Sequence, residues 1–214
     1  MSWEETYTIW NKRPDLAPEV REDLDKIAND KEALEDAFYT PMEFGTAGMR
    51  GLIGAGINRM NIYTVRQATE GLARFMDTLD EETKLRGVAI SYDSRHMSQE
   101  FAFEAARVLG AHGIPSFVFE SLRPTPELSF TVRHLHAYAG IMITASHNPK
   151  QYNGYKIYGE DGAQMPPKES DMITNYIREV DDLFAVEVAD KDALINDNTL
   201  QVIGSEVDEV YLEN

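Results

Sequence analysis

The fold follows from one stretch of the chain, Tyr138-Ala139-Gly140-Ile141-Met142-Ile143, which runs directly into Thr144-Ala145-Ser146-His147-Asn148-Pro149. The first half is short and apolar, as is typical of a strand buried inside a sheet. The second half is a turn, because Thr, Ser and Asn side chains can satisfy loop backbone groups and Pro149 prevents a helix from starting there. The sequence therefore predicts a buried strand that ends in a fixed loop carrying Ser146.

The flanking segments repeat an alternation of strand and helix. Strands are predicted at 87–92, 116–119 and 154–158, and helices at 98–109, 126–133 and 169–180. Such alternation is typical of parallel strands joined by crossover helices. We expect an α/β fold, a three-layer α/β/α sandwich with a mixed, mainly parallel sheet. The Ser146 loop then lies at the carboxyl edge of that sheet, where ligands of such folds usually bind.

The amino-terminal part has a different character. Residues 3–39 predict two or three short helices, a helical lead-in broken at Pro14 and Pro18. Residues 41–56 hold five glycines and predict a loop whose backbone must turn or approach something closely. A helix is expected from about Ile62 to Leu79.

Composition bounds the class of protein. The 214 residues are 43% hydrophobic, enough for a buried core, and they contain no cysteine, which excludes disulfides and thiolate metal sites. No run of about 18 apolar residues occurs, and the first residues lack the pattern of a secretory signal. We expect a cytoplasmic protein.

The negative charge is concentrated at the two ends of the chain. The formal net charge is -17, of which residues 1–40 contribute -6 and residues 160–214 contribute -12, while residues 41–159 carry +1. Nucleic acids and anionic membranes need a basic face, so the overall charge argues against both as partners. The middle of the chain, which holds Ser146, is balanced.

Ser146 has the surroundings of a serine that carries phosphate. From Thr144 to Tyr158 the ionisable cations are His147, Lys150 and Lys156, and no carboxylate occurs, so a phosphoryl group would meet attraction or neutrality. An isolated serine would ordinarily be a turn residue. A Ser–His hydrolase pair is disfavoured, because neighbouring side chains diverge on an extended backbone and no G-x-S-x-G elbow is present.

Other candidate residues accompany the serine. His147 could donate a hydrogen bond to a phosphoserine or shuttle a proton, and Lys156 could neutralise a transferring phosphoryl group or exchange a proton with a hydroxyl. Arg50, between Gly48 and Gly51, offers a guanidinium fork suited to phosphate. Arg95 follows another strand end and could instead form a structural ion pair with Asp93.

Nucleotide and metal motifs are missing from the sequence. It has neither a P-loop nor a G-x-G-x-x-G after a strand, and its carboxylates show no spacing that a hard cation site would need.

Four motifs together closely resemble the α-D-phosphohexomutase superfamily, and most of all its phosphoglucomutase/phosphopentomutase branch. They are Glu43-Phe44-Gly45-Thr46-Ala47-Gly48-Met49-Arg50-Gly51, Ser91-Tyr92-Asp93-Ser94-Arg95, Thr144-Ala145-Ser146-His147-Asn148-Pro149 and Asn153-Gly154-Tyr155-Lys156. Their order and spacing make the resemblance specific over about residues 41–168. Residues 1–40 are similar to the helical lead-in of that branch.

The resemblance implies a reaction and roles for residues. Ser146 would be the phosphoserine that gives its phosphoryl group to a sugar monophosphate and is rephosphorylated from the bisphosphate intermediate, with glucose phosphate as first choice. Lys156 and His147 match positions credited with acid and base help, and Arg50 matches the arginine near the phosphoserine. Substrate contacts are expected from Thr144, Asn148, Lys150 and Arg95.

The resemblance also implies that other parts of the protein are needed. Family members have four domains around a cleft, and the chain lacks their Asp-rich Mg²⁺ loop, sugar loop and final phosphate loop. We expect residues 1–40 as a lead-in, 41–204 as domain I and 205–214 as the start of a truncated domain II. One Mg²⁺ ion would touch this chain only through the Ser146 phosphate, and glucose 1,6-bisphosphate would be activator and intermediate. The expected partners are a sugar phosphate and the remaining domains, and the chain alone is expected to be inactive or nearly so.

Two other functions fit the same residues. A stand-alone binding or regulatory module could hold an anion or sugar phosphate at the Ser146 loop without catalysis. A phosphatase or phosphotransferase could use Ser146 as a nucleophile without moving phosphate along a sugar.

Overall fold

The computed structural model describes residues 1–46 and 48–214; Ala47, within the first of the four motifs, lies outside the described residues. Three short helices open the chain, α1 (Trp3–Asn11), α2 (Pro18–Ile27) and α3 (Lys31–Phe38). Ser2 and Glu5 form a capping box at α1, Pro18 occupies the first turn of α2, and Asp30 caps α3. The predicted helical lead-in is confirmed.

The lead-in has its own apolar cluster around Trp10, which is buried. The Trp10 ring meets Phe38 and Tyr63 edge to face, at centroid distances of 5.6 and 5.4 Å. Tyr63 belongs to α4 (Ile62–Met76), and its hydroxyl accepts a hydrogen bond of 2.9 Å from the backbone N–H of Ala17. The lead-in is therefore packed against the first helix of the α/β part.

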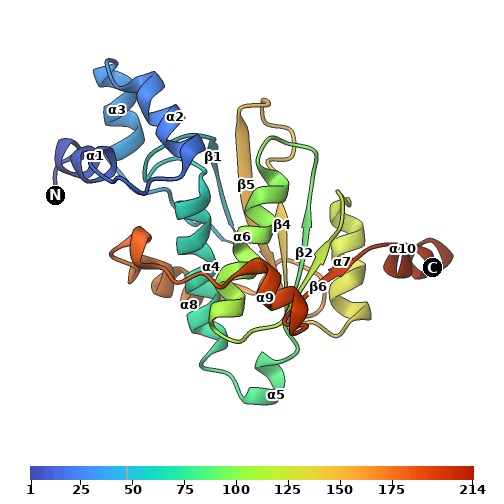
Figure 1. Ribbon diagram of the computed structural model, residues 1–214. Helices are drawn as coiled ribbons and strands as arrows, with labels where there is room; N and C mark the ends of the chain where they lie inside the picture. The colour runs from blue at the N-terminus through green and yellow to red at the C-terminus, as the bar shows by residue number, and fades with distance from the viewer. Residues whose placement is uncertain (47) are drawn as a thin grey trace.

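The centre of the molecule is a six-stranded sheet (Figure 1). Its strands are β1 (Gly48–Leu52), β2 (Val88–Tyr92), β3 (Ser116–Phe119), β4 (Ala139–Ile143), β5 (Tyr152–Tyr158) and β6 (Leu200–Ile203), in the order β1-β5-β4-β2-β3-β6. Neighbours among β4, β2, β3 and β6 are parallel, whereas β5 is antiparallel to both β4 and β1. The expectation of a mixed, mainly parallel sheet is confirmed.

Helices cover both faces of the sheet, which makes the predicted three layers. One face packs against α4, α6 (Ser98–Ala111), α8 (Pro167–Arg178) and α9 (Lys191–Asn196), and the other against α7 (Thr125–His134) and α10 (Ser205–Glu213). The short α5 (Glu81–Lys84) and the 3₁₀ helix η1 (Leu183–Ala185) complete the described elements. Alternate residues of β2 and β4 enter opposite layers, and both strands are wholly buried, as their apolar runs predict.

The structure corrects three predictions. Residues 41–56 are not only a loop, because β1 lies within them; Gly48 is needed there since a Cβ would collide with the Tyr155 carbonyl of β5. The strand predicted at 154–158 begins two residues earlier, at Tyr152, and the turn before it closes with the Tyr152 N–H donating to the Pro149 carbonyl at 3.0 Å. Residues 191–203, for which the sequence predicted no helix or strand, hold α9 and β6, whose short sequences carry too little periodicity to signal them.

Residues 205–213 form α10, which lies against α7 (Figure 1). Its Tyr211 ring centroid is 5.4 Å from that of Phe130. Asp208 forms an ion pair with Arg123, which lies in the loop between β3 and α7. Whether these residues open a second domain stays a prediction. Within the described ranges, no helix has both the length and the apolar character that crossing a membrane requires.

Candidate functional site

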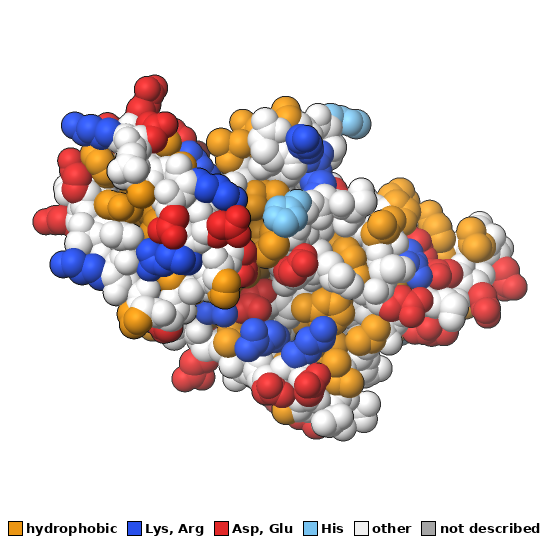
Figure 2. Space-filling model, turned by 45° about the horizontal axis from the view of Figure 1, so that its top comes forward, with side chains coloured by type: hydrophobic (Ala, Val, Ile, Leu, Met, Phe, Trp, Pro, Cys, Tyr) orange, Lys and Arg blue, Asp and Glu red, His pale blue; other side chains and the backbone are white. Residues whose placement is uncertain are grey.

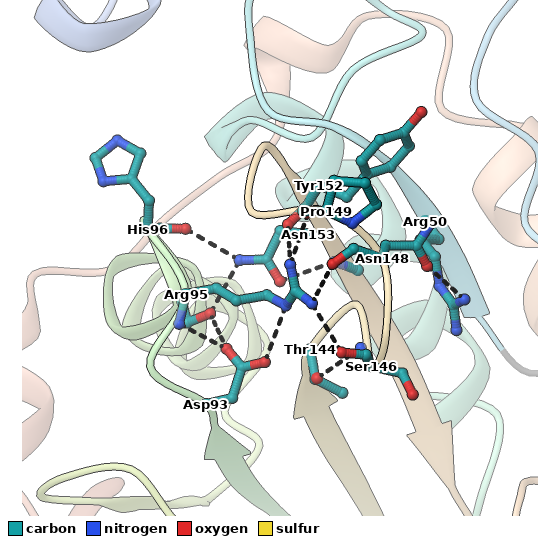
Figure 3. A network of polar contacts seen from close by, with 12 residues as sticks. Arg50, Asp93, Arg95, His96, Thr144, Ser146, Asn148, Pro149, Tyr152 and Asn153 are labelled. Atoms are coloured by element: carbon teal, nitrogen blue, oxygen red, sulfur yellow. Dashed lines mark hydrogen bonds and ion pairs between the residues drawn. The ribbon is translucent and has the colours of Figure 1, made fainter.

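The Ser146 loop lies where the carboxyl ends of β4 and β2 meet, as the sequence predicts. Tyr92 of β2 pairs with Ile143 of β4, and the N–H of Asp93 donates to the Ile143 carbonyl at 3.1 Å. Both strands end at this level, so the loops after them lie side by side (Figure 3). The Ser146 loop and the Asp93–His96 loop therefore share one edge of the sheet.

Ser146 has a left-handed backbone conformation and an exposed side chain. Its φ is 54°, in a region that residues with a Cβ rarely adopt. Its N–H donates to the Thr144 hydroxyl at 3.0 Å, and the N–H of Asn148 donates to the Ala145 carbonyl at 3.1 Å. Ala145 is buried beneath the loop. These contacts hold the Ser146 hydroxyl outward, toward solvent.

Thr144 and Arg95, both predicted to contact substrate, make hydrogen bonds within the protein. Thr144 is buried, with 7% of its surface exposed, and its hydroxyl accepts the Ser146 N–H. The Arg95 guanidinium donates to three carbonyls of the Ser146 loop and to that of Tyr152 at the start of β5, and it faces the Asp93 carboxylate. Both residues therefore shape the loop, and Arg95 forms the ion pair with Asp93 that the sequence offered as its other role, while substrate contact by either residue stays a prediction.

Arg50 reaches the Ser146 loop from the edge strand β1, which is separated from β4 by β5. The β1 strand places Arg50 opposite Gly154 of β5, and its Nη1 donates to Oδ1 of Asn148 at 2.8 Å. The two residues are 98 positions apart in the sequence. Gly154 is required at this position, because a Cβ would meet the Thr144 and Met49 carbonyls. The exposed Arg50 guanidinium thus lies beside the Ser146 loop, as expected of a phosphate contact.

The other candidate cations, His147, Lys150 and Lys156, make no polar side-chain contacts with the described residues. His147 and Lys150 are exposed on the loop itself. Lys156 is partly buried in β5, opposite Met142 of β4, on the sheet face that α7 covers. The structure brings His147 and Lys150 to the loop but shows no hydrogen bond between Lys156 and the Ser146 loop among the described residues.

A surface depression opens beside Ser146. Its lining consists of Asp93, Ser94, Arg95, His96, Ser146, Asn148 and Lys150. Asp93 is the one carboxylate in this lining, and its Oδ2 is 3.3 Å from Nε of Arg95. Figure 2 shows basic and histidine side chains at the upper centre, with acidic side chains just below them and on both sides of the molecule. The depression therefore suits an anion although the chain carries a net charge of -17.

Sequence reasoning missed three contributors to this site. His96 lines the depression and was signalled only by following Arg95 directly. Asn153 is fully buried and donates through Nδ2 to the His96 carbonyl at 3.1 Å and to the Ser98 hydroxyl at 2.9 Å. Ser98 in turn donates to Asp93 Oδ1 at 2.7 Å. Asn153 opens the fourth motif, but the sequence predicts no role for it, and Ser98 carries no chemical signature that could have marked it.

The residues around Ser146 do not fit a Mg²⁺ site by themselves. Among the described residues, no three Asp, Glu or His side chains group closely enough to hold a metal ion. Asp93, the nearest candidate ligand, is already bound by Arg95 and Ser98. A hard cation prefers several carboxylate oxygens, which this part of the protein does not supply.

Comparisons with known proteins agree with this geometry. Residues 41–183 match the family model described as phosphoglucomutase/phosphomannomutase, alpha/beta/alpha domain I. A phosphoglucomutase of Staphylococcus aureus (strain bovine RF122 / ET3-1) is 46% identical over 153 residues, which cover 72% of this chain and 27% of that protein. A phosphoglucomutase of Staphylococcus saprophyticus is 41% identical over 174 residues, which cover 81% of this chain and 31% of that protein.

A solved structure shows the same fold. The crystal structure of a protein of phosphomannomutase type from Thermus thermophilus aligns with a TM-score of 0.58 and 29% identity, over 77% of this chain and 32% of that chain. The chain thus spans about a third or less of the length of the relatives it matches. The sheet, the motif positions and the family match lead to one conclusion: this chain belongs to the phosphoglucomutase/phosphomannomutase family and carries its α/β/α domain I.

Proposed function

We propose that this chain is the phosphoserine-bearing part of an enzyme that interconverts sugar 1-phosphate and sugar 6-phosphate, with glucose phosphate as the substrate. The observation that carries the proposal is the exposed hydroxyl of Ser146 on a fixed loop, next to an anion-friendly depression. The family match supports a phosphoryl-transferring isomerase. We propose the cytoplasm as its location, consistent with a chain that has no cysteine.

The chemistry divides into two transfers. A sugar hydroxyl attacks phosphorus and gives its proton to a base, while the bond between phosphorus and Ser146 Oγ breaks and Oγ takes up a proton. In the second transfer the Ser146 hydroxyl gives its proton to a base as Oγ attacks the other phosphoryl group of the bisphosphorylated sugar, and the released sugar oxygen takes a proton. The same side chain is leaving group and nucleophile, which turns one difficult migration into two simpler steps. The bisphosphorylated sugar, glucose 1,6-bisphosphate, is thus intermediate and activator.

The cations take separate roles in this proposal. Arg50 lies beside the loop through Asn148 and would contact the phosphoserine, since a guanidinium offers a fork matched to phosphate oxygens. Lys150 and Asn148 line the depression and would contact the incoming phosphate. His147, exposed on the loop, would donate a hydrogen bond that orients the phosphoserine, or would shuttle a proton.

Lys156 is assigned acid–base help or phosphate neutralisation, and its position in β5 supports this only in part. It lies one strand from the loop, opposite Met142, and its long side chain would have to reach the phosphoryl group. Completion of the site would come from further domains, which would also supply the ligands of any Mg²⁺ ion apart from the Ser146 phosphate. We expect the 214-residue chain alone to turn over little or no substrate.

The test is a glucose 1-phosphate to glucose 6-phosphate assay on the protein from the complete reading frame that contains this chain. Ser146→Ala should lower turnover at least ~10³-fold, because the variant has lost the oxygen that carries the phosphoryl group. Incubation with glucose 1,6-bisphosphate should add one phosphate, located to Ser146 by mass spectrometry, and none to the variant. Thr144→Ser, which keeps the hydroxyl that accepts the Ser146 N–H, is the matched control and should retain activity.

Three outcomes would contradict the proposal. Undiminished turnover in Ser146→Ala would remove the nucleophile. Release of inorganic phosphate in place of glucose 6-phosphate would make the protein a phosphatase. Binding of sugar phosphate without any turnover or phosphorylation would make it a binding module.

A further inference from the structure

The Arg95 side chain is committed almost completely to the backbone of the Ser146 loop. Its Nη1 donates to the carbonyls of Pro149 and Tyr152 at 2.9 and 3.1 Å, and its Nη2 to those of Ser146 and Asn148 at 2.8 and 2.7 Å. Its Nε is 3.3 Å from the Asp93 carboxylate. A guanidinium has five N–H donors, so each of them faces an acceptor of the protein itself.

The arginine is anchored in turn by buried contacts. Asp93 accepts hydrogen bonds from the Arg95 N–H at 2.9 Å and from the Ser98 hydroxyl at 2.7 Å. Ser98, fully buried at the start of α6, also accepts from Asn153 of β5. Figure 3 shows the Arg95 guanidinium between the Asp93 carboxylate and the loop carbonyls. The anchor therefore joins the end of β2, the start of α6 and β5.

The loop needs such an anchor because of its shape. Ser146 has a φ of 54°, a left-handed conformation that is unfavourable for a residue with a Cβ. The carbonyls of an irregular loop also have no strand partner to fix their direction. Four hydrogen bonds from one rigid, planar group fix four carbonyls at once, which a flexible ammonium could not do.

We propose that Arg95, held by Asp93, is a positioning residue that clamps the loop in the conformation presenting Ser146 Oγ, and that it does not contact the sugar phosphate. Its side chain is only 14% exposed, which leaves little surface for a ligand. The catalytic consequence rests on the proposed function, whereas the effect on the loop does not. Misplacing a reacting atom by about 1 Å costs on the order of 10²-fold in rate, so loss of the clamp should act on kcat.

The first arm of the experiment follows the loop in the 214-residue chain, by amide hydrogen exchange and NMR. Arg95→Lys keeps the charge but loses the fork, and it should raise exchange at least ~10-fold at the amides of Ser146, Asn148 and Tyr152, which donate within the loop. Amides in β2 and β4 should be unchanged, which shows that the fold is intact. Arg50→Lys is the matched control, because the Arg50 guanidinium donates to the Asn148 side chain of the loop rather than to its carbonyls; loop exchange should stay as in the unchanged chain.

The second arm measures turnover of glucose 1-phosphate by the protein from the complete reading frame. Arg95→Lys should lower kcat by about 10²-fold with KM changed less than about 3-fold, whereas Arg50→Lys should raise KM. In Arg95→Ala, added guanidinium at low millimolar concentration should restore part of kcat and part of the loop protection. Asp93→Asn, a milder change, should show the same pattern to a smaller extent, which keeps the test valid if the Arg95 variants fold poorly.

The outcomes separate the two proposals. Unchanged loop exchange in Arg95→Lys, or a loss confined to KM, overturns the clamp. Loosened loop amides in a protein that has no mutase activity even when unmodified would support the clamp and contradict the proposed function.

Discussion

Two arginines follow neighbouring strands of the same sheet edge, and their surroundings are opposite. Arg95, after β2, faces the single carboxylate of Asp93 and gives its other donors to carbonyls of the Ser146 loop. Arg123, after β3, binds both oxygens of Asp208 at 2.7 and 2.8 Å. In addition, carboxylate oxygens of Glu120 and Glu127 lie 3.7 and 4.0 Å from nitrogens of the same guanidinium.

Ionisation follows these surroundings. Hydrogen bonds from Arg123 hold the pKa of Asp208 below its ordinary value. Burial, reinforced by the Asp208 carboxylate, raises the pKa of Glu127 from 4.5 to about 7. Three carboxylates thus surround Arg123, whereas the Ser146 side of the same edge keeps Arg50, His147 and Lys150 exposed and available for an anion. Both arginines follow the carboxyl end of a parallel strand. Their neighbours differ, so Arg95 binds the Ser146 loop whereas Arg123 binds carboxylates.

The largest effect is expected from adding an acid on the Ser146 side. Asn148→Asp would place a carboxylate beside Arg50, whose Nη1 lies 2.8 Å from Oδ1 of Asn148. The new charge would neutralise Arg50 and repel a phosphoryl group, and phosphorylation of Ser146 should slow by about 10–100-fold, or about 1.4–2.8 kcal/mol. Rates of phosphorylation by glucose 1,6-bisphosphate, taken at low and high salt, measure it.

The matched change on the other side is Ser121→Asp, because the Ser121 hydroxyl accepts from Arg123 Nη1 at 2.6 Å. It should leave the rate within about 2-fold, since three carboxylates already surround Arg123. Equal losses in the two variants would show that the two sides of the edge do not differ in the way described.

A smaller effect, on stability, is expected from Asp208→Asn. The change removes two charge-assisted hydrogen bonds of Arg123 and should lower the free energy of unfolding at pH 7 by about 1–3 kcal/mol. It also removes the carboxylate that raises the pKa of Glu127, so that pKa should fall from about 7 toward 4.5. Denaturant unfolding and a carboxyl NMR titration of Glu127 measure the two effects.

The pH dependence in the unchanged chain follows from the raised pKa of Glu127. Between about pH 4.5 and 7 the folded chain holds a proton that the unfolded chain has lost, so stability from this group falls as pH rises through that window. The slope is at most ~1.4 kcal/mol per pH unit. Glu127→Gln should flatten it, and a slope equal to that of the unchanged chain would refute the assignment.

The smallest effect is expected at His112, a cation neutralised far from Ser146. Its Nε2 is 2.8 Å from Glu70 and its Nδ1 2.6 Å from Asp77, and hydrogen bonds to these carboxylates, Glu70 first, raise its pKa. Its contribution to stability is therefore complete below the unfolded pKa of about 6.5 and is lost as pH rises through the higher folded value.

His112→Gln should remove this loss while costing below about 1 kcal/mol, because the pairs are partly solvated. Unfolding measured from about pH 6 to about pH 9, a range that brackets the unfolded pKa of histidine, checks it. Turnover of the complete protein by the His112→Gln variant should be unchanged. A marked fall would show that His112, although paired with Glu70 and Asp77, also affects the Ser146 loop.

Most of the sheet could be predicted because its strands carry local signals. The runs at 88–92 and 139–143 are almost wholly apolar, which by itself indicates buried strands, and the helices between the strands show clear periodicity. β1 could not be predicted, because its Gly-Met-Arg-Gly-Leu sequence forms a strand only when β5 supplies the hydrogen bonds. β6 has the same difficulty, since Leu200–Ile203 gain their order from pairing with β3.

By itself, the sequence determined the sheet edge, the Ser146 loop, the absence of acids from Thr144 to Tyr158 and the family resemblance, because all of these are local patterns. Only the tertiary structure decided the partners of the arginines. Arg50 reaches Asn148 across 98 residues through antiparallel pairing of β1 with β5, and Arg95 is occupied by carbonyls of a loop 51 residues or more further along the chain. Backbone carbonyls are identical in every residue, so no sequence pattern can announce which of them a guanidinium will bind.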